Sequence, residues 1–215
     1  VGLLVLEPHM SGIVLTTAIV GTILMLGGSG GVITWACAGL GASLLQTLLG
    51  HIDSIPYLQS RLDGWTQDLS QMTDQTLHSL YAIGSGGLLG KGLGQSIQKL
   101  SFLPEPQNDM IFAVICEELG LFGAVAVIFM FLFMLYRFLV IAGNAPDLFG
   151  AMLVTGVLAH IAIQVVLNIA VVTNVIPNTG ITLPFISYGG TSVLFLMIEM
   201  GMVLSVSNQI RLEQQ

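Results

Sequence analysis

Charged side chains are what this sequence has least of. Asp, Glu, Lys and Arg make up 8% of its 215 residues and hydrophobic residues 54%, whereas about a quarter of the residues in a soluble domain are charged. The bases, five against twelve acids, are too few to form a basic face for a nucleic acid. Cysteine is scarce too. Cys37 and Cys116 both lie in apolar runs, which indicates buried small side chains and neither a disulfide nor a metal pair. These shortages exclude an ordinary soluble domain and indicate a membrane protein.

Long apolar runs set the expected fold. A helix needs roughly 20 apolar residues to cross about 30 Å of hydrocarbon. Five runs approach that length: residues 10–26, 32–49, 111–136, 148–172 and 191–206. We therefore predict an all-α polytopic membrane protein, a single membrane domain over residues 1–215 with about five transmembrane helices. Because the chain opens inside an apolar run that Glu7 and Pro8 end, we also expect it to be the C-terminal part of a longer membrane protein.

Residues 50–110 form a large polar loop between the second and third of these runs. Part of the loop is expected to be helical, because residues 74–83 place Leu77, Leu80, Tyr81 and Ile83 on one face. That pattern is typical of an amphipathic helix at a membrane surface. A glycine-rich stretch, residues 84–94, follows it.

The order of loops and spans also predicts an orientation. Three expected spans follow the large loop, so this loop and the C-terminus lie on opposite faces of the membrane. Arg137 and Arg211 flank short segments on the C-terminal side, which favours the cytoplasm for that side. We expect residues 50–110, and a second polar loop at residues 174–190, to be extracytoplasmic.

Asp109 stands where the large loop meets the apolar run that starts at Ile111. One interpretation is a helix N-cap, because a carboxylate there accepts bonds from free N–H groups and suits the helix dipole. The other is a general base at the membrane–water boundary, to which a lipid-linked substrate delivers a hydroxyl. The two roles are compatible, and the residues alone leave both open.

The cations of the large loop are the second group of candidates. Lys91, Lys99 and Arg61 could contact a lipid diphosphate or could be ordinary solvated side chains. The glycine-rich stretch is not a nucleotide-binding loop, because Gly92 stands where Ser or Thr should follow Lys91. The four histidines have no metal-ligand spacing, so no metal site is predicted from the residues.

Acids inside the apolar runs form the third group, because charge at that depth is costly and often functional. Glu117 and Glu118 either serve function or pair structurally with Lys91 or Lys99. Deeper in the spans, polar residues could form a structural network, in which Glu199 pairs with His160 or Gln164, or could line a transport path: His160, Gln164, Asn168 and Glu199.

Three long segments carry a resemblance to a known family: AIGSGGLLGKGLGQSIQKLSFLPEPQNDMIFAVICEELGLFG at 82–123, APDLFG at 145–150 and IQVVLNIAVVTNVIPNTGITLPFISYGGTS at 163–192. They resemble the SEDS family (shape, elongation, division and sporulation proteins, including FtsW, RodA and SpoVE), and look closest to its FtsW/SpoVE branch. The resemblance covers essentially the whole chain. It implies roughly the second half of a ten-span plasma-membrane protein with cytoplasmic termini.

The family resemblance implies a peptidoglycan glycosyltransferase that polymerises lipid II onto a growing glycan strand. It implies Asp109 as the catalytic residue. Our hypothesis adds Lys91, Lys99 and Arg61 as candidate contacts of the diphosphate leaving group. The remaining substrate-binding residues would be Glu117, Glu118 and, in the link 184–190 that shapes the outer cavity, Ser187 and Tyr188.

The expected partners are a class B penicillin-binding protein, other division proteins and membrane lipids. A divalent cation, Mg²⁺ or Mn²⁺, could assist the leaving group. Two other functions stay open at this point. One is a lipid II transporter that uses the polar residues inside the spans, and the other is a non-catalytic scaffold for a division synthase.

Overall fold

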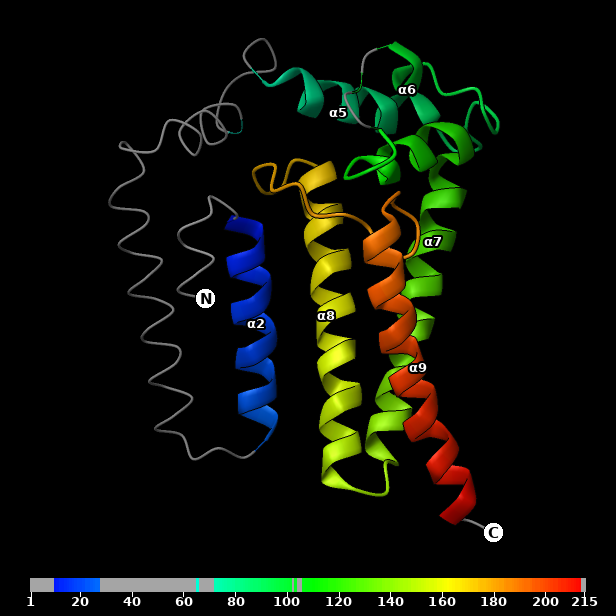
Figure 1. The fold of residues 1–215 in the computed structure, drawn as a ribbon. Coiled ribbons are helices and arrows are strands. Elements are labelled where there is room, and N and C mark those ends of the chain that lie inside the picture. The colour runs from blue at the N-terminus through cyan, green and yellow to red at the C-terminus, as the bar shows by residue number, and fades with distance from the viewer. Residues whose placement is uncertain (1–9, 28–64, 66–71, 102, 104–105, 214–215) are drawn as a thin grey trace, which may run out of the picture. The chain divides into compact units, whose positions relative to one another are not determined.

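The computed structural model describes residues 10–27, 65, 72–101, 103 and 106–213. All regular structure within these ranges is helical: α2 Met10–Leu26, α5 Asp74–Gly86, α6 Gln98–Ser101, α7 Ile111–Gly143, α8 Leu148–Val172 and α9 Gly190–Glu213 (Figure 1). The chain divides into two compact units. One consists of residues 1–54, 133–163 and 191–215, and the other of residues 55–132 and 164–190. The predicted all-α fold is confirmed.

Three of the described helices are long and apolar enough to cross a membrane: Ile111–Gly143, Leu148–Val172 and Gly190–Ile210. They correspond to the last three spans that the sequence predicts. Helix α2 coincides with the first predicted run but has only 17 residues, and the run at 32–49 lies outside the described residues. Large apolar side chains on α7, such as Phe122 and Phe129, are 67% exposed, as expected of a helix surrounded by lipid.

Helix α7 extends seven residues beyond the predicted end at Tyr136. The charge of Arg137, the next residue, does not end the helix, because arginine is a good helix former whose apolar stem can lie along a helix in lipid. The helix instead ends at Gly143, shortly before Pro146, which cannot continue it. Asp147 then accepts a hydrogen bond from the Gly150 amide at 3.2 Å, so it caps α8, the role expected of an Asp placed just before an apolar run.

The unit that includes α2 and most of α9 has an apolar interior. Helices α7, α8 and α9 all contribute buried side chains to it, among them Phe138, Val154, Val157 and Val203. Gly150 lets α8 approach α9 closely, because a Cβ there would lie 3.2 Å from a methyl group of Val206.

The other unit is built around α5, which packs through small residues. Its buried positions are Thr76, Ser79, Ala82 and Gly86, whereas the apolar face predicted from the sequence remains partly exposed, with Tyr81 51% exposed. Gly86 is required by this packing, since a Cβ there would lie 1.9 Å from the carbonyl oxygen of Cys116 on α7. The Ser79 hydroxyl donates to the Val172 carbonyl at the end of α8 at 2.9 Å. The helix was predicted correctly, and its small-residue face holds it against α7 and α8.

Helix α7 is broken at Gly120, where φ is 67° and ψ is -164°, a conformation that is essentially restricted to glycine. In a regular helix the amides of Leu121 and Phe122 would donate four residues back along α7. Here they donate instead to the carbonyls of Gly87 and Leu88, at 2.9 and 3.3 Å. Two amides of α7 therefore donate to residues 87–95, a segment that we call the glycine loop.

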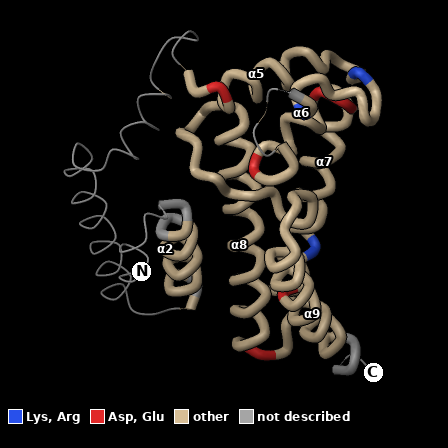
Figure 2. Tube along the Cα trace, turned by 45° about the horizontal axis from the view of Figure 1, so that its top comes forward, with Lys and Arg blue, Asp and Glu red and all other residues tan. Residues whose placement is uncertain are grey.

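The carbonyls that this break leaves free in α7 accept from the same loop. The Glu117 carbonyl accepts from the Lys91 amide and the Glu118 carbonyl from the Gly92 amide, both at 2.9 Å. The glycine loop is thus inserted into the hydrogen-bond ladder of α7, and these two amides and two carbonyls of α7 all have partners in it. Charged residues of this unit lie along the chain near α5, α6 and the start of α7 (Figure 2).

Candidate functional site

Asp109 lies in a turn just before α7 and is 9% exposed. Two other segments of the same unit hold the backbone of this turn. The Asn168 side chain on α8 donates to the Asp109 carbonyl at 2.8 Å and to the Ile181 carbonyl at 2.7 Å. The Tyr188 amide donates to the Gln107 carbonyl at 2.8 Å. The backbone that carries Asp109 is therefore fixed to α8 and to the 174–190 loop.

The Asp109 carboxylate faces α5. The Gln75 amide nitrogen lies 3.3 Å from Oδ1 and 3.4 Å from Oδ2, so one side-chain amide donates to both oxygens. The Gln75 oxygen in turn accepts from the Asn178 side-chain amide at 2.9 Å. Sequence reasoning missed Gln75 and Asn178, which lie 34 and 69 positions from Asp109 and belong to no pattern around it.

The cap interpretation of Asp109 needs a correction by one residue. Helix α7 starts at Ile111, and the carbonyl of Met110 accepts its first bonds, from Ala113 at 3.0 Å and Val114 at 3.4 Å. An N-cap residue is the one whose carbonyl accepts the first intrahelical bond, so Met110 holds that position. Asp109 remains one residue ahead of it, at the N-terminal end of the helix dipole.

Glu117 and Glu118 pair with the two lysines of the large loop. Lys91 Nζ lies 2.7 Å from Glu117 Oε1, and Lys99 Nζ lies 2.5 Å from Glu118 Oε1. The Glu117 side chain has no exposed surface, while the lysine side chains are 29% and 30% exposed. The structural pairing that the sequence left open is therefore present.

Both carboxylates also accept hydrogen bonds from the end of the glycine loop or from the segment that follows it. Glu117 accepts from the Ser96 hydroxyl and from the amides of Ile97 and Gln98. Glu118 accepts from the Gly94 amide at 2.9 Å and the Ser96 amide at 3.4 Å. Two buried acids thus organise residues 91–99 on the side of α7.

A cavity of about 480 Å³ lies between this segment and the start of α7. Its wall is apolar except for the Lys99–Glu118 pair and Gln107. Gln107 also belongs to the turn that carries Asp109, so the cavity adjoins that turn.

Ser187 and Tyr188, predicted to bind substrate, have different surroundings. Ser187 is 7% exposed, and its hydroxyl accepts from the Leu183 amide at 2.7 Å, so it closes the turn 183–187. Tyr188 is 77% exposed, and only its backbone amide is engaged with the Asp109 turn among the contacts described above. Arg61 lies outside the described residues, so its role stays a prediction.

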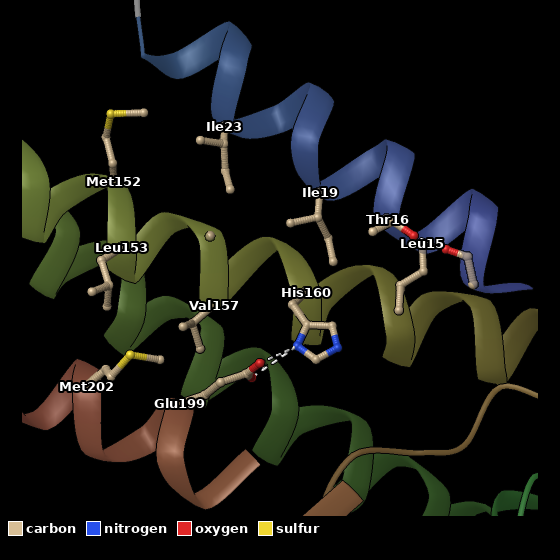
Figure 3. A pocket seen from close by; sticks show the side chains of 12 residues that line it. Leu15, Thr16, Ile19, Ile23, Met152, Leu153, Val157, His160, Glu199 and Met202 are labelled. Atoms are coloured by element: carbon tan, nitrogen blue, oxygen red, sulfur yellow. Dashed lines mark hydrogen bonds and ion pairs between the residues drawn. The ribbon is translucent and has the colours of Figure 1, made fainter. Parts of the chain in front are cut away.

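A second polar feature lies in the other unit, in the apolar part of the helices. His160 Nδ1 is 2.9 Å from Glu199 Oε1 and 3.0 Å from Oε2, the pair that the sequence suggested. Both side chains point into a cavity of about 550 Å³ that is otherwise lined mostly by aliphatic residues of α2, α8 and α9 (Figure 3).

Among the described residues, no three His, Cys, Asp or Glu side chains lie close enough together to hold a metal ion. At Asp109 the Gln75 side chain presents its donor nitrogen to the carboxylate, and a divalent cation would need an oxygen there. These residues alone do not form a protein cage for Mg²⁺ or Mn²⁺, and the cation stays a prediction.

The long apolar helices and the buried polar turn define the chain as a polytopic membrane protein with a candidate site at one end of its helices. Its sequence matches the model of the FtsW/RodA/SpoVE family of cell cycle proteins over residues 1–212. The chain belongs to this family, as the sequence motifs predicted.

Curated relatives support the same assignment. Stage V sporulation protein E of Bacillus subtilis is 47% identical over 176 residues, which cover 80% of this chain and 48% of the relative. The probable peptidoglycan glycosyltransferase FtsW of Trichlorobacter lovleyi is 38% identical over 214 residues, covering 98% of this chain and 55% of the relative. The chain spans about half the length of the curated relatives it matches.

Two solved structures share the fold. One is a chain from a peptidoglycan synthase complex that coordinates polymerization and crosslinking. It matches with a TM-score of 0.73 and 26% identity, and the match covers 98% of this chain and 59% of that one. The other is a mutant of the rod shape determining protein RodA of Thermus thermophilus, with a TM-score of 0.59, 26% identity and coverage of 94% and 51%.

Proposed function

We propose that the protein containing this chain is a peptidoglycan glycosyltransferase that polymerises lipid II, and that Asp109 is its general base. One observation carries the proposal: a nearly buried carboxylate stands at the start of a membrane-spanning helix, on a turn whose backbone is held by α8 and by the 174–190 loop. The relatives named as peptidoglycan glycosyltransferases supply the reaction class.

In this reaction the 4-hydroxyl of the acceptor sugar attacks the anomeric carbon of the lipid-linked donor. Asp109 takes the hydroxyl proton as the new β-1,4 C–O bond forms. The bond from the anomeric carbon to the diphosphate oxygen breaks, and undecaprenyl diphosphate leaves with the bonding electron pair. A base with little solvent around it suits this step, because water would otherwise compete as acceptor.

The leaving group carries negative charge that cations can stabilise. We assign this role to Lys91 and Lys99, with Arg61 as a third candidate. The partial exposure of the two lysines leaves room for a diphosphate oxygen beside each ion pair. Because Glu117 and Glu118 already neutralise the two lysines, each lysine will contribute less to diphosphate binding than a free cation would.

The same proposal covers the setting of the reaction. The 50–110 and 174–190 loops would face the extracytoplasmic side, where lipid II and the growing strand are found, and the C-terminus would be cytoplasmic. A class B penicillin-binding protein would crosslink the product, which agrees with the likeness to a chain of a peptidoglycan synthase complex.

The experiment is lipid II polymerisation by the purified full-length protein with its partner synthase, comparing wild type with Asp109→Asn. Asparagine keeps the size of the side chain and an oxygen for Gln75, but it cannot take up the proton. Asp74→Asn is the matched control, because Asp74 is an exposed acid on the same loop. Glycan strands should disappear with the first variant only. Undiminished strand synthesis by Asp109→Asn would rule out this assignment.

A lipid transporter is the second candidate, favoured by the His160–Glu199 pair in its apolar cavity. Transport would depend on this pair and not on Asp109. Vesicles containing the full-length protein distinguish the two: translocation of lipid II that is lost in His160→Leu and kept in Asp109→Asn would favour transport.

A further inference from the structure

Three amides form a chain that ends on the Asp109 carboxylate. The Gly180 backbone amide donates to Asn178 Oδ1 at 3.0 Å, Asn178 Nδ2 donates to Gln75 Oε1 at 2.9 Å, and Gln75 Nε2 donates to both Asp109 oxygens at 3.3 and 3.4 Å. The members come from the 174–190 loop, from α5 and from the turn before α7.

The chemistry of these groups fixes the direction of the chain. Side-chain amides can be turned end for end, and such assignments depend on their partners. The backbone amide of Gly180 can only donate, so it requires the oxygen of Asn178 to face it. The Asn178 nitrogen then faces Gln75, whose oxygen must turn toward it, and the Gln75 nitrogen is left pointing at Asp109.

We propose that Gln75 and Asn178 are positioning residues for Asp109, with Asn178 setting the orientation of the Gln75 amide so that a donor always faces the carboxylate. The inference rests on the proposed function, in which Asp109 is the base. It assigns the two outer loops a shared role, because the loop that contains Asn178 controls a contact made by α5.

The chain suits a base better than a purely structural carboxylate. A neutral donor favours the ionised form, which is the form that can accept a proton. Its hydrogen bonds to Asp109 are long, and a neutral donor binds a carboxylate less tightly than a cation does. Through this contact Gln75 orients the carboxylate and favours its ionised form with a neutral amide.

The test is the pH dependence of lipid II polymerisation by the full-length protein with its partner synthase. Gln75→Glu replaces the donor with a carboxylate of nearly the same shape. Because a second negative charge disfavours ionised Asp109, the acidic limb of the rate profile should move to higher pH by about one unit. Gln75→Leu, which only removes the donor, should move it in the same direction by less.

Asn178 provides a second, independent variant. Asn178→Asp places an acceptor opposite Gln75 Oε1, which drives the Gln75 amide to turn and present its oxygen to Asp109. The acidic limb should again move to higher pH. In a Gln75→Leu background the same substitution should shift the limb by less, because only the direct effect of the added charge remains once the amide is gone.

The control is Gln209→Glu, which makes the same chemical change on an exposed residue of α9 and should leave the profile unchanged. Melting in detergent identifies any variant that fails to fold. If one of Gln75→Glu, Gln75→Leu and Asn178→Asp fails, the profiles of the other two decide. Unshifted profiles for folded Gln75 and Asn178 variants, with Asp109→Asn inactive, would overturn the positioning role and leave the proposed function standing. An active Asp109→Asn would instead overturn the proposed function.

Discussion

At the residue scale, Glu117 does more for the structure than its position in an apolar helix suggests. Its side chain has no exposed surface, yet it accepts from Lys91, Ser96 and the amides of Ile97 and Gln98. Burying a charge is costly unless it is paired and hydrogen-bonded. This carboxylate meets both conditions, so its net role is to fix one conformation of the segment that follows the glycine loop.

We therefore expect Glu117→Ala to be more destabilising than Lys91→Met. Removing the carboxylate leaves several buried donors without a partner and should cost about 2–4 kcal/mol. Removing the lysine takes away the counter-charge of Glu117 but leaves its other donors in place, and water can reach the partly exposed lysine position, so it should cost about 1–2 kcal/mol. Thermal unfolding in detergent gives the order of the two variants, and limited proteolysis between residues 87 and 101 locates the change. A larger loss for Lys91→Met would contradict this account of the site.

The His160–Glu199 pair leads to a different expectation, because its surroundings are apolar. His160→Leu should destabilise the protein by leaving the Glu199 carboxyl in the cavity without its histidine. Adding Glu199→Leu should restore part of the stability, with a coupling energy of about 1–3 kcal/mol. A double-mutant cycle of melting temperatures measures this coupling. Additive effects of the two substitutions would mean that the hydrogen bond contributes nothing to stability.

At the element scale, the break in α7 decides how the large loop is attached to the membrane-spanning helix. Residues 111–119 form a short helix that carries Glu117 and Glu118. The glycine loop forms hydrogen bonds with the backbone of α7 on both sides of Gly120. Gly120 makes this possible by its backbone conformation and by its lack of a side chain. A Cβ at Gly120 would lie 2.3 Å from the Gly90 nitrogen and 2.6 Å from the Leu88 oxygen.

Gly120→Ala should therefore destabilise the protein, by about 1–3 kcal/mol from backbone strain alone and further through the clash with the loop. Gly84→Ala is the matched control, since Gly84 is helical and a Cβ there meets nothing within 4 Å. It should be neutral, or stabilising by about 0.5–1 kcal/mol. Melting temperatures in detergent compare the two, and equal effects would show that the break does not depend on glycine.

The sequence predicted individual elements well where local chemistry marks their ends. The bounds of α8 follow from the cap at Asp147 and the polar residues after Val172. The break at Gly120 could not be predicted, because glycine is common in transmembrane helices and the break depends on a loop some 30 positions away in the sequence. The buried face of α5 was missed for a similar reason: close packing on α7 selects small residues, while hydrophobic periodicity points to the leucines.

At the scale of the whole molecule, the family, the all-α class and Asp109 as the leading candidate could all be obtained from the sequence. The surroundings of Asp109 could not be predicted from the sequence. Gln75, Asn168 and Asn178 are uncharged residues from three segments, and nothing in their local sequence links them to a carboxylate elsewhere. Their meeting depends on how α5, α8 and the 174–190 loop pack together, which is a tertiary property.

The central claim is that Asp109 takes up a proton in the chemical step and does not merely hold the turn. The most direct measurement is the single-turnover rate of glycosidic bond formation by the full-length protein with its partner, at saturating lipid II, for wild type, Asp109→Asn and the control Asp74→Asn. A lost general base should slow the chemical step of Asp109→Asn by about 100-fold or more, with lipid II binding little changed and the control unaffected. A wild-type single-turnover rate for Asp109→Asn, with any loss confined to binding or stability, would contradict the account.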